Sequence, residues 1–396
     1  SSLSPMGQAL SFCGALLSRK CKCTDVIDDI VFKPPCPCSY IISEVAGTIK
    51  GQVFINEVSY PLADNVRVFY LPVKGNQSIC CMHIVSQNSN AVIIYSHANA
   101  ADCGTMLPRC TQIAVHLDVD VIIYDYEGYG YSDGSPSEAA MLRDLELVFK
   151  FALGAFSPKH IFLYGESIGS VPTCNLCSQL YKQKKRINLS RNLTGEESAT
   201  FIPLQDHHRS NWDIETPNSP VDSSVDSDPE TVSNSSETSP RSSIRTRASL
   251  IQEKRKQTPS LSHSSSLFGP NPRLLQISIE KQLHAGSIQF NTLVTPIGGI
   301  ILHSAIVSGR KLLPCSSSLC CIKAFSNEQT ARTVNVPVFH IHGMKDDIVP
   351  FSLGEQLYNM TNSSYEPWWV PDAHHNDIVY THEKEYYDRL GDRKSV

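Results

Sequence analysis

The sequence predicts an α/β fold in which helices flank a mostly parallel central sheet. Short runs of β-branched and aromatic residues alternate with longer helical stretches along the chain. That alternation is typical of strand–helix–strand units, which build parallel sheets. The apolar fraction of 41% is close to that of ordinary globular proteins, so a chain of 396 residues can bury a sizeable core.

The expected strands fall into two groups separated by a polar region. Each is a short apolar run of the kind found in buried strands. The first group is Val66–Tyr70, Ile79–Val85, Ala91–Ser96, Val119–Tyr126 and His160–Tyr164, and the second is Gly299–His303, Val338–His342 and Tyr365–Val370. Helices are expected at 138–153, where Ser137 is a typical N-cap residue, and at 171–180, 352–360 and 382–390.

Composition divides the chain into four segments. Residues 1–50 are rich in cysteine, and residues 183–294 are rich in Ser, Thr, Asn, Pro and charged side chains. The latter segment is expected to be a long disordered insertion, because it cannot bury enough apolar surface to offset the entropy of ordering. Residues 51–182 and 295–396 are expected to form one folded unit. Only about 30 residues separate two strands of the second group, which leaves no space for a large cap.

Charge and cysteine spacing argue against several classes of function. The formal net charge of −5 offers no basic face to a nucleic acid. The pairs Cys21–Cys23 and Cys36–Cys38 lack the spacing and the partner histidines of zinc sites, so neither a metal nor a cofactor is expected. No signal-peptide pattern is present, which makes a disulfide framework the weaker interpretation of the 14 cysteines. No apolar run approaches the roughly 18 residues of a membrane span.

A candidate nucleophile follows the strand at 160–164. Gly165-Glu166-Ser167-Ile168-Gly169 matches the G-x-S-x-G pattern, with a strand before it and a helical stretch after it. A strand–turn–helix of this kind needs small residues at Gly165 and Gly169, because the turn holds Ser167 in a strained conformation with its hydroxyl accessible. This context predicts the nucleophile elbow of an α/β-hydrolase fold. The alternative is a glycine-flanked helix start without chemistry.

A serine nucleophile needs a base, and the base needs a carboxylate to orient it. In this fold the chain order is Ser, then Asp or Glu, then His. Asp346 and Asp347 follow one late strand, and His374 and His375 follow another. Asp346 and His375 are the favoured acid and base, although spacing alone does not decide within either pair. A solvated turn is the alternative for the two aspartates.

The oxyanion of an acyl-transfer reaction needs two backbone N–H donors. Ile168, directly after the nucleophile, is expected to supply one. The other is expected from the turn after the third strand, at Asn99. His97, in the same turn, is expected to brace the loop by hydrogen bonding.

Several of these segments together resemble one known family. The residues concerned are Tyr95–Ala100, Asp125–Gly134 with Pro136–Glu138, Tyr164–Pro172, Leu302–Ser304 and His375–Asp377. Together they resemble the α/β-hydrolase domain-containing protein 17 family, and the related protein 13 family shares much of the pattern. The resemblance covers nearly all of both folded segments. It implies a membrane-attached serine hydrolase that removes palmitoyl groups from cysteines of proteins at the cytosolic face, with Ser167, Asp346 and His375 as its triad.

Two features depart from the pattern of that family. Its oxyanion loop reads His-Gly-Asn, whereas this chain has Ala98 at the glycine, and a Cβ there is strained if the backbone needs a positive φ. The insertion at 183–294 is also absent from typical members. It falls at a surface connection, where long additions cost little folding free energy.

The resemblance further implies a palmitoylated N-terminus that attaches the chain to membranes. The pattern that begins at Met6 also matches N-myristoylation, which would place myristate on Gly7 if Met6 is the true start. One acyl chain holds a protein only marginally, so a second on Cys13, Cys21 or Cys23 would complete the anchor. The expected location is peripheral, on the cytoplasmic face of the plasma membrane or endosomes, with a cytosolic pool. The alternative is that these cysteines are free or buried.

The expected reaction is hydrolysis of S-palmitoyl thioesters on membrane-associated proteins through an acyl-serine intermediate. S-palmitoylated proteins are thus the expected partners, and no oligomeric state is predicted. A lipid or small-molecule ester hydrolase with the same triad is one alternative. Another is a catalytically weak scaffold that presents a phosphorylated insertion to partners, with candidate sites at Ser219-Pro220, Ser239-Pro240 and Thr258-Pro259.

Overall fold

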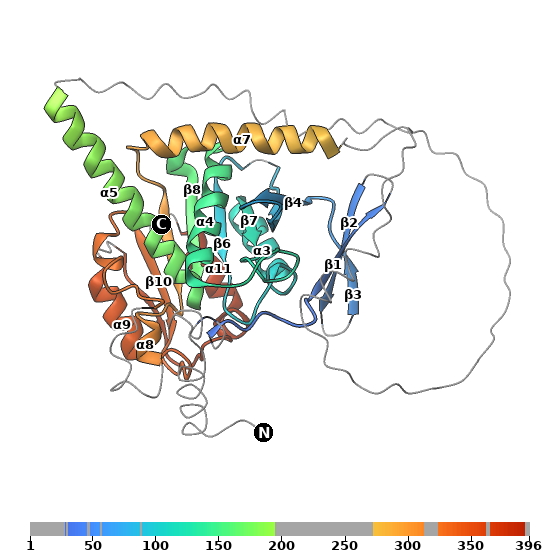
Figure 1. Cartoon of the computed structure of the whole chain (residues 1–396). Helices are drawn as coiled ribbons and strands as arrows, with labels where there is room; N and C mark the ends of the chain where they lie inside the picture. The colour runs from blue at the N-terminus through green and yellow to red at the C-terminus, as the bar shows by residue number, and fades with distance from the viewer. Residues whose placement is uncertain are drawn as a thin grey trace, which may run out of the picture.

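The main element of the fold is an eight-stranded sheet, and the computed structural model describes residues 28, 31–45, 48–55, 58–87, 89–194, 272–312, 324–361 and 365–392 (Figure 1). The strand order is β11-β10-β9-β8-β6-β7-β5-β4. Every neighbouring pair among β6 to β11 is parallel, whereas β5 is antiparallel to β7 and to β4. The expected mostly parallel sheet is therefore confirmed.

The eight strands lie where the sequence predicts them. Their bounds are β4 (Val66–Pro72), β5 (Ser78–Ile84), β6 (Val92–Ser96), β7 (Asp120–Tyr124), β8 (Ile161–Glu166), β9 (Gly299–His303), β10 (Val338–Gly343) and β11 (Trp368–Val370). β6, β7 and β9 are buried along their whole length, as expected of strands that are covered on both faces.

Helices cover both faces of this sheet. The first face packs against α3 (Cys103–Leu117), α10 (Ile378–Thr381) and α11 (Glu383–Gly391), and the second against α4 (Glu138–Leu153), α5 (Ser170–Thr194) and α9 (Phe351–Met360). The Ser137 side chain caps α4 by accepting from the N–H of Ala140, as its residue type predicts. Between β9 and β10, the described residues form only the short helices α8 (Gly309–Leu312) and η4 (Ala331–Thr333), and these residues contain no large cap domain.

A second, smaller sheet precedes the main one, and its strands are not among those expected from the sequence. It is antiparallel and consists of β1 (Tyr40–Val45), β2 (Thr48–Ile55) and β3 (Val58–Pro61) (Figure 1). Because β2 crosses residue 50, the expected boundary between segments 1–50 and 51–182 is wrong at that point. Phe32 and Tyr40 are buried in the two core clusters, so the later part of segment 1–50 belongs to the folded unit.

The expected disorder of residues 183–294 is wrong at both ends of that range. α5 continues to Thr194, and α7 (Pro272–Thr292) is a long helix beside α4 (Figure 1). Phe290 of α7 makes an edge contact with Phe149 of α4, and the Lys150 ammonium lies 4.8 Å from the centre of the Phe290 ring. Burial against α4 therefore stabilises α7, although the polar composition of its sequence does not predict a helix. Residues 195–271 lie outside the described part of the chain.

The expected membrane attachment concerns residues that the structure does not describe. Gly7, Cys13, Cys21 and Cys23 all lie before residue 28. Within the described ranges, none of the helices combines the length and the apolar character needed to cross a bilayer.

The contact between α4 and α7 predicts an unusual response to alanine. A Cβ added at Gly286 would lie 1.6 Å from the carbonyl oxygen of Lys150. Alanine normally stabilises a helix interior by about 1 kcal/mol relative to glycine. Here we expect Gly286→Ala to destabilise the protein by about 2 kcal/mol, because the helices must separate.

Thermal unfolding followed by circular dichroism measures this effect. His284→Ala, at an exposed position of the same helix, is the matched control and should leave Tm unchanged. A Tm of Gly286→Ala at or above that of the wild type would contradict the close approach of the two helices.

Candidate active site

Ser167 lies on the sharp turn between β8 and α5. Its φ of 52° is a left-handed conformation that is uncommon for residues other than glycine. A Cβ at Gly169 would lie 2.1 Å from the Ser96 carbonyl oxygen, and one at Gly165 would lie 2.7 Å from the Gly169 carbonyl oxygen. Both glycines are therefore required by the packing of the turn, which agrees with the pattern of a nucleophile elbow.

His375 and Asp346 lie in line with the Ser167 hydroxyl. Oγ of Ser167 is 3.1 Å from Nε2 of His375, and Nδ1 of His375 is 2.7 Å from Oδ2 of Asp346. Because an ionised carboxylate only accepts hydrogen bonds, Nδ1 carries the proton and Nε2 accepts from the serine hydroxyl. All three side chains are largely buried. This arrangement can remove the hydroxyl proton and stabilise the imidazolium that results.

The structure distinguishes the adjacent candidates that spacing leaves open. The side chains of Asp347 and His374 are 76% and 53% exposed and lie 3.9 Å apart at the surface. Asp346 and His375 are buried instead. The chain of contacts that begins at Ser167 therefore runs through Asp346 and His375.

The carboxylate of Asp346 has partners on both oxygens. Oδ1 accepts from the backbone N–H groups of Ile348 at 2.9 Å and Val349 at 2.7 Å. Oδ2 faces His375 and also Nε2 of His342, which is 3.3 Å away. Burial by itself raises the pKa of Asp346, but hydrogen bonds from His342, His375 and the backbone hold it well below its usual range. Asp346 is therefore ionised at neutral pH.

The loop after β6, residues 97–100, lies beside the elbow, because a Cβ at Gly169 would also lie 3.0 Å from the His97 carbonyl oxygen. Ala98 is not among the described residues with a positive φ, so its Cβ adds no backbone strain. Burial lowers the pKa of His97, and Nδ1–H of this neutral ring donates to the Ala98 carbonyl oxygen at 2.8 Å. His97 thus braces the loop. The backbone N–H groups of Ile168 and Asn99 stay the predicted oxyanion donors.

Two further residues contact the loops that carry Asp346 and His375, and neither is among the site residues expected from the sequence. Nε2 of the buried His342 donates to the Val349 carbonyl oxygen at 2.9 Å, in the loop that carries Asp346. Ser304 has a φ of 46°, and its hydroxyl donates to the His375 carbonyl oxygen at 3.3 Å. Both residues lie at the carboxyl ends of strands, β10 and β9, and that position is the signal by which they could have been found.

Glu166, directly before Ser167, belongs to a buried ion pair. Its carboxylate accepts from Arg109 at 2.7 Å and from the Tyr95 hydroxyl at 2.7 Å. Burial by itself raises the pKa of Glu166, but Arg109 and Tyr95 outweigh it and hold the pKa below its usual range. The G-x-S-x-G pattern leaves this position free, so no local signal in the sequence points to the pair.

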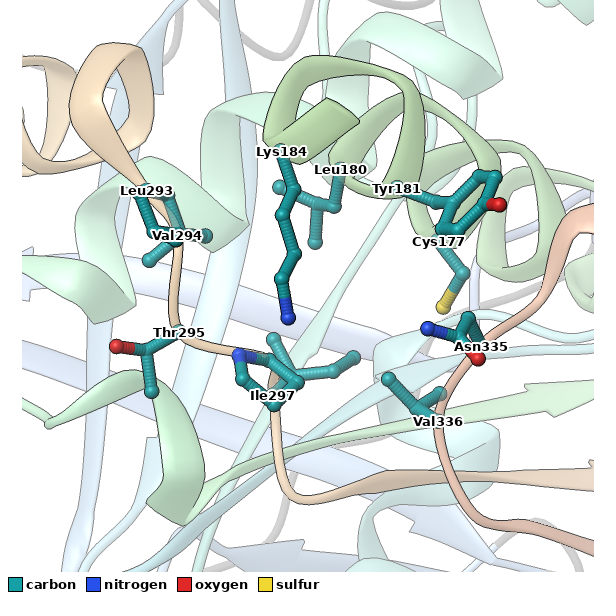
Figure 2. A pocket seen from close by; sticks show the side chains of 11 residues that line it. Cys177, Leu180, Tyr181, Lys184, Leu293, Val294, Thr295, Ile297, Asn335 and Val336 are labelled. Atoms are coloured by element: carbon teal, nitrogen blue, oxygen red, sulfur yellow. The ribbon is translucent and has the colours of Figure 1, made fainter. Parts of the chain in front are cut away.

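A cavity of about 30 Å³, whose lining residues Figure 2 shows, includes none of these groups in its wall. Cys177 and Leu180 of α5 line it, together with Ile297 and Val336, which precede β9 and β10. It therefore opens at the amino ends of the strands, opposite Ser167, and has space for only one or two water molecules. In the part of the chain that the structure describes, no group of three or more His, Cys, Asp and Glu side chains is placed to hold a metal ion.

The Glu166–Arg109 pair predicts how stability changes with pH. Because the folded-state pKa of Glu166 is below the ordinary value of 4.5, the stabilisation is full above that pH and is lost as pH falls below it. Arg109→Met leaves the carboxyl buried without its cation, and burial then raises its pKa. We expect this variant to be less stable by about 3–5 kcal/mol at pH 7 and to recover relative to wild type as pH falls.

Urea unfolding between pH 7 and pH 4 measures the difference between the two proteins. The double variant Arg109→Met/Glu166→Gln, which has no unpaired charge, is the control and should show no such recovery. Equal pH dependence of wild type and Arg109→Met would contradict the pairing.

The contact of His342 with Asp346 predicts a loss of turnover at a buried position. His342→Phe keeps a ring but removes the N–H, so we expect a fall of about tenfold in kcat for a small ester, with KM unchanged. His340→Phe is the matched control, since His340 lies on the same strand but bonds to Thr361 at 2.9 Å. Steady-state kinetics at 25 °C compares them, and an equal loss of kcat in both variants would show that only general destabilisation is at work.

Comparison with known proteins extends these observations. A sequence model described as Phospholipase/Carboxylesterase matches residues 296–379. The chain is 23% identical over 373 residues to the alpha/beta hydrolase domain-containing protein aho-3 of Caenorhabditis elegans, covering 93% of this chain and 77% of that protein. It is 23% identical over 361 residues to the alpha/beta hydrolase domain-containing protein 17C of Xenopus tropicalis, covering 90% and 76%. A solved esterase of Pyrococcus furiosus, Pf2001, aligns with a TM-score of 0.44 and 12% identity over 82% of this chain and 88% of that one. The chain has an α/β-hydrolase fold and resembles the alpha/beta hydrolase domain-containing protein 17 family over about 90% of its length.

Proposed function

We propose that this protein is a serine hydrolase that removes palmitoyl groups from S-acylated cysteines of membrane-associated proteins. The hydrolase class is supported by the fold and by the relatives. The observation that carries the proposal is the contact chain from Ser167 through His375 to Asp346, with distances of 3.1 Å and 2.7 Å. In this proposal Ser167 is the nucleophile, His375 the base and Asp346 the acid.

The chemistry follows from these contacts. His375 Nε2 takes the proton of Ser167 Oγ as that oxygen attacks the thioester carbonyl carbon. The backbone N–H groups of Ile168 and Asn99 hold the oxyanion. The C–S bond breaks, the cysteine sulfur leaves with the proton from His375, and an acyl-serine remains. Water, activated by His375, then hydrolyses the acyl-serine to palmitate and free Ser167.

Two features support an acyl chain on a membrane-associated substrate. Met344 and Ile348, which flank Asp346 in the loop after β10, have 45% and 52% of their surface exposed. Large apolar side chains at such positions suit contact with an acyl chain or a membrane surface. The N-terminal segment also meets the oxyanion loop, where Lys33 N–H donates to Asn99 at 3.0 Å. Lipid on Gly7, Cys13, Cys21 or Cys23 would therefore keep the site close to the cytoplasmic face of a membrane.

A second candidate substrate is a lipid or small-molecule ester. The family description Phospholipase/Carboxylesterase at residues 296–379 favours it, because that stretch includes Asp346 and His375. The same proton transfers apply, with an alkoxide in place of a thiolate as the leaving group. The scaffold alternative depends on the insertion, and its candidate phosphorylation sites lie outside the described residues.

Release of labelled palmitate from an S-acylated membrane protein tests the proposal. We expect Ser167→Ala and His375→Ala to lower kcat/KM by at least about 10³-fold, because the triad acts as a unit. His374→Ala is the matched control and should retain activity, since its side chain is at the surface. Turnover of a monoacylglycerol without release from the acyl-protein would contradict the thioesterase assignment and favour the lipid ester.

A further inference from the structure

Three residues of the N-terminal segment, Val31, Phe32 and Lys33, contact the oxyanion loop, and we call them the N-terminal strap. The side chain of Asn99 binds the backbone of the strap at two points. Its Nδ2 donates to the Val31 carbonyl oxygen at 2.7 Å, and its Oδ1 accepts from the Lys33 N–H at 3.0 Å. A side-chain amide that is bonded on both of its ends has one orientation, so the strap and the loop fix each other.

Phe32 anchors the strap in the core. It is 5% exposed, and its ring makes edge contacts with Tyr129 at 6.1 Å and with Phe325 at 5.4 Å between ring centres. The Tyr129 hydroxyl also donates to Oδ1 of Asn99 at 2.8 Å. One buried aromatic residue therefore touches both the strap and the amide that holds it.

The loop that carries Asn99 is built into the site from its other side. The His97 carbonyl oxygen, two residues before Asn99, accepts from the Tyr126 hydroxyl at 2.8 Å. The same loop approaches the elbow, because a Cβ at Gly169 would lie 3.0 Å from the His97 carbonyl oxygen. The position of the Asn99 N–H relative to Ser167 is thus set by contacts on both sides of the loop, and the strap supplies one of them.

We propose that the N-terminal strap is part of the catalytic apparatus, and that the Asn99 side chain is the positioning residue through which the strap holds the oxyanion loop. This inference rests on the proposed serine-hydrolase function. Docking of the strap fixes the Asn99 N–H where the oxyanion forms, and its release leaves that donor mobile. Turnover by Ser167 consequently depends on residues that directly follow the N-terminal region where lipidation is expected.

Kinetics of the full chain with p-nitrophenyl butyrate test the proposal. Phe32→Ala removes the aromatic side chain that anchors the strap. Asn99→Ala removes the two side-chain hydrogen bonds to the strap but keeps the backbone N–H of residue 99. Loss of an oxyanion donor costs about 10²–10³-fold in kcat, so a donor that is present but loosened should cost about tenfold, with KM within about twofold. The inhibition constant of phenylboronic acid, which forms a tetrahedral adduct on serine, should rise by the same factor.

A double-mutant cycle decides whether the strap acts through Asn99. If it does, the variant with both substitutions loses no more kcat than either single variant. Multiplied losses would overturn the proposal. Ile41→Ala, an exposed position farther along the same segment, is the control and should keep wild-type kcat. If thermal unfolding shows that Phe32→Ala does not fold, Phe32→Leu replaces it in the cycle, because this change keeps an apolar side chain and removes the ring contacts with Tyr129 and Phe325.

Two outcomes distinguish failure of the proposed function from failure of the strap proposal. A wild-type chain that neither hydrolyses the ester nor reacts with a fluorophosphonate at Ser167 would refute the proposed function, and the strap proposal with it. A reactive wild type whose folded Phe32 and Asn99 variants keep kcat and boronate affinity within twofold would refute the strap proposal alone.

Discussion

The turn at Ser167 is the constraint on which the rest of the site depends. The backbone reverses from β8 into α5 within three residues, and it does so with Ser167 at a φ of 52°. The turn packs so closely against the end of β6 that Gly169 has no space for a Cβ beside Ser96. One steric requirement therefore holds Ser167 in its strained conformation and brings the loop after β6, which carries the predicted oxyanion donor, beside it.

Buried charge around this turn is paired rather than avoided. Glu166 meets Arg109 and Tyr95 on one side of the elbow, and Asp346 collects two backbone N–H groups and two imidazoles on the other. An unpaired carboxylate at either place would bind a proton and lose its charge, because desolvation disfavours the charged form. Pairing keeps Asp346 ionised and able to orient His375, and it ties Glu166 to Arg109 of α3.

The N-terminal residues show that the folded unit extends beyond the part that carries the motifs. Phe32 packs with Tyr129 and Phe325, whereas Tyr40 donates to Asp125 in the loop after β7. Segment 31–40 thereby crosses from the loop after β6 to the small β1–β3 sheet. The sequence does not predict this packing of residues 31–40. Their cysteine-rich composition suggests membrane attachment but has no periodic pattern that would indicate a buried face.

The sequence by itself determined the main sheet, the elbow and the class of residues in the site. Strands that are buried on both faces have continuous apolar sequences, and these predict the main sheet. The tight turn at Ser167 requires the two glycines beside it, and these predict the elbow. Spacing placed an aspartate and a histidine at the ends of late strands, where parallel strands bring catalytic groups together.

Only the tertiary structure decided between Asp346 and Asp347 and between His374 and His375, because neighbours in a turn differ in burial and not in local pattern. It also revealed α7, whose polar sequence is stabilised by α4, and the pairing of Glu166 with Arg109, 57 residues away. Contacts between distant residues leave no periodic trace in a single sequence. They are fixed by which surfaces the fold brings together.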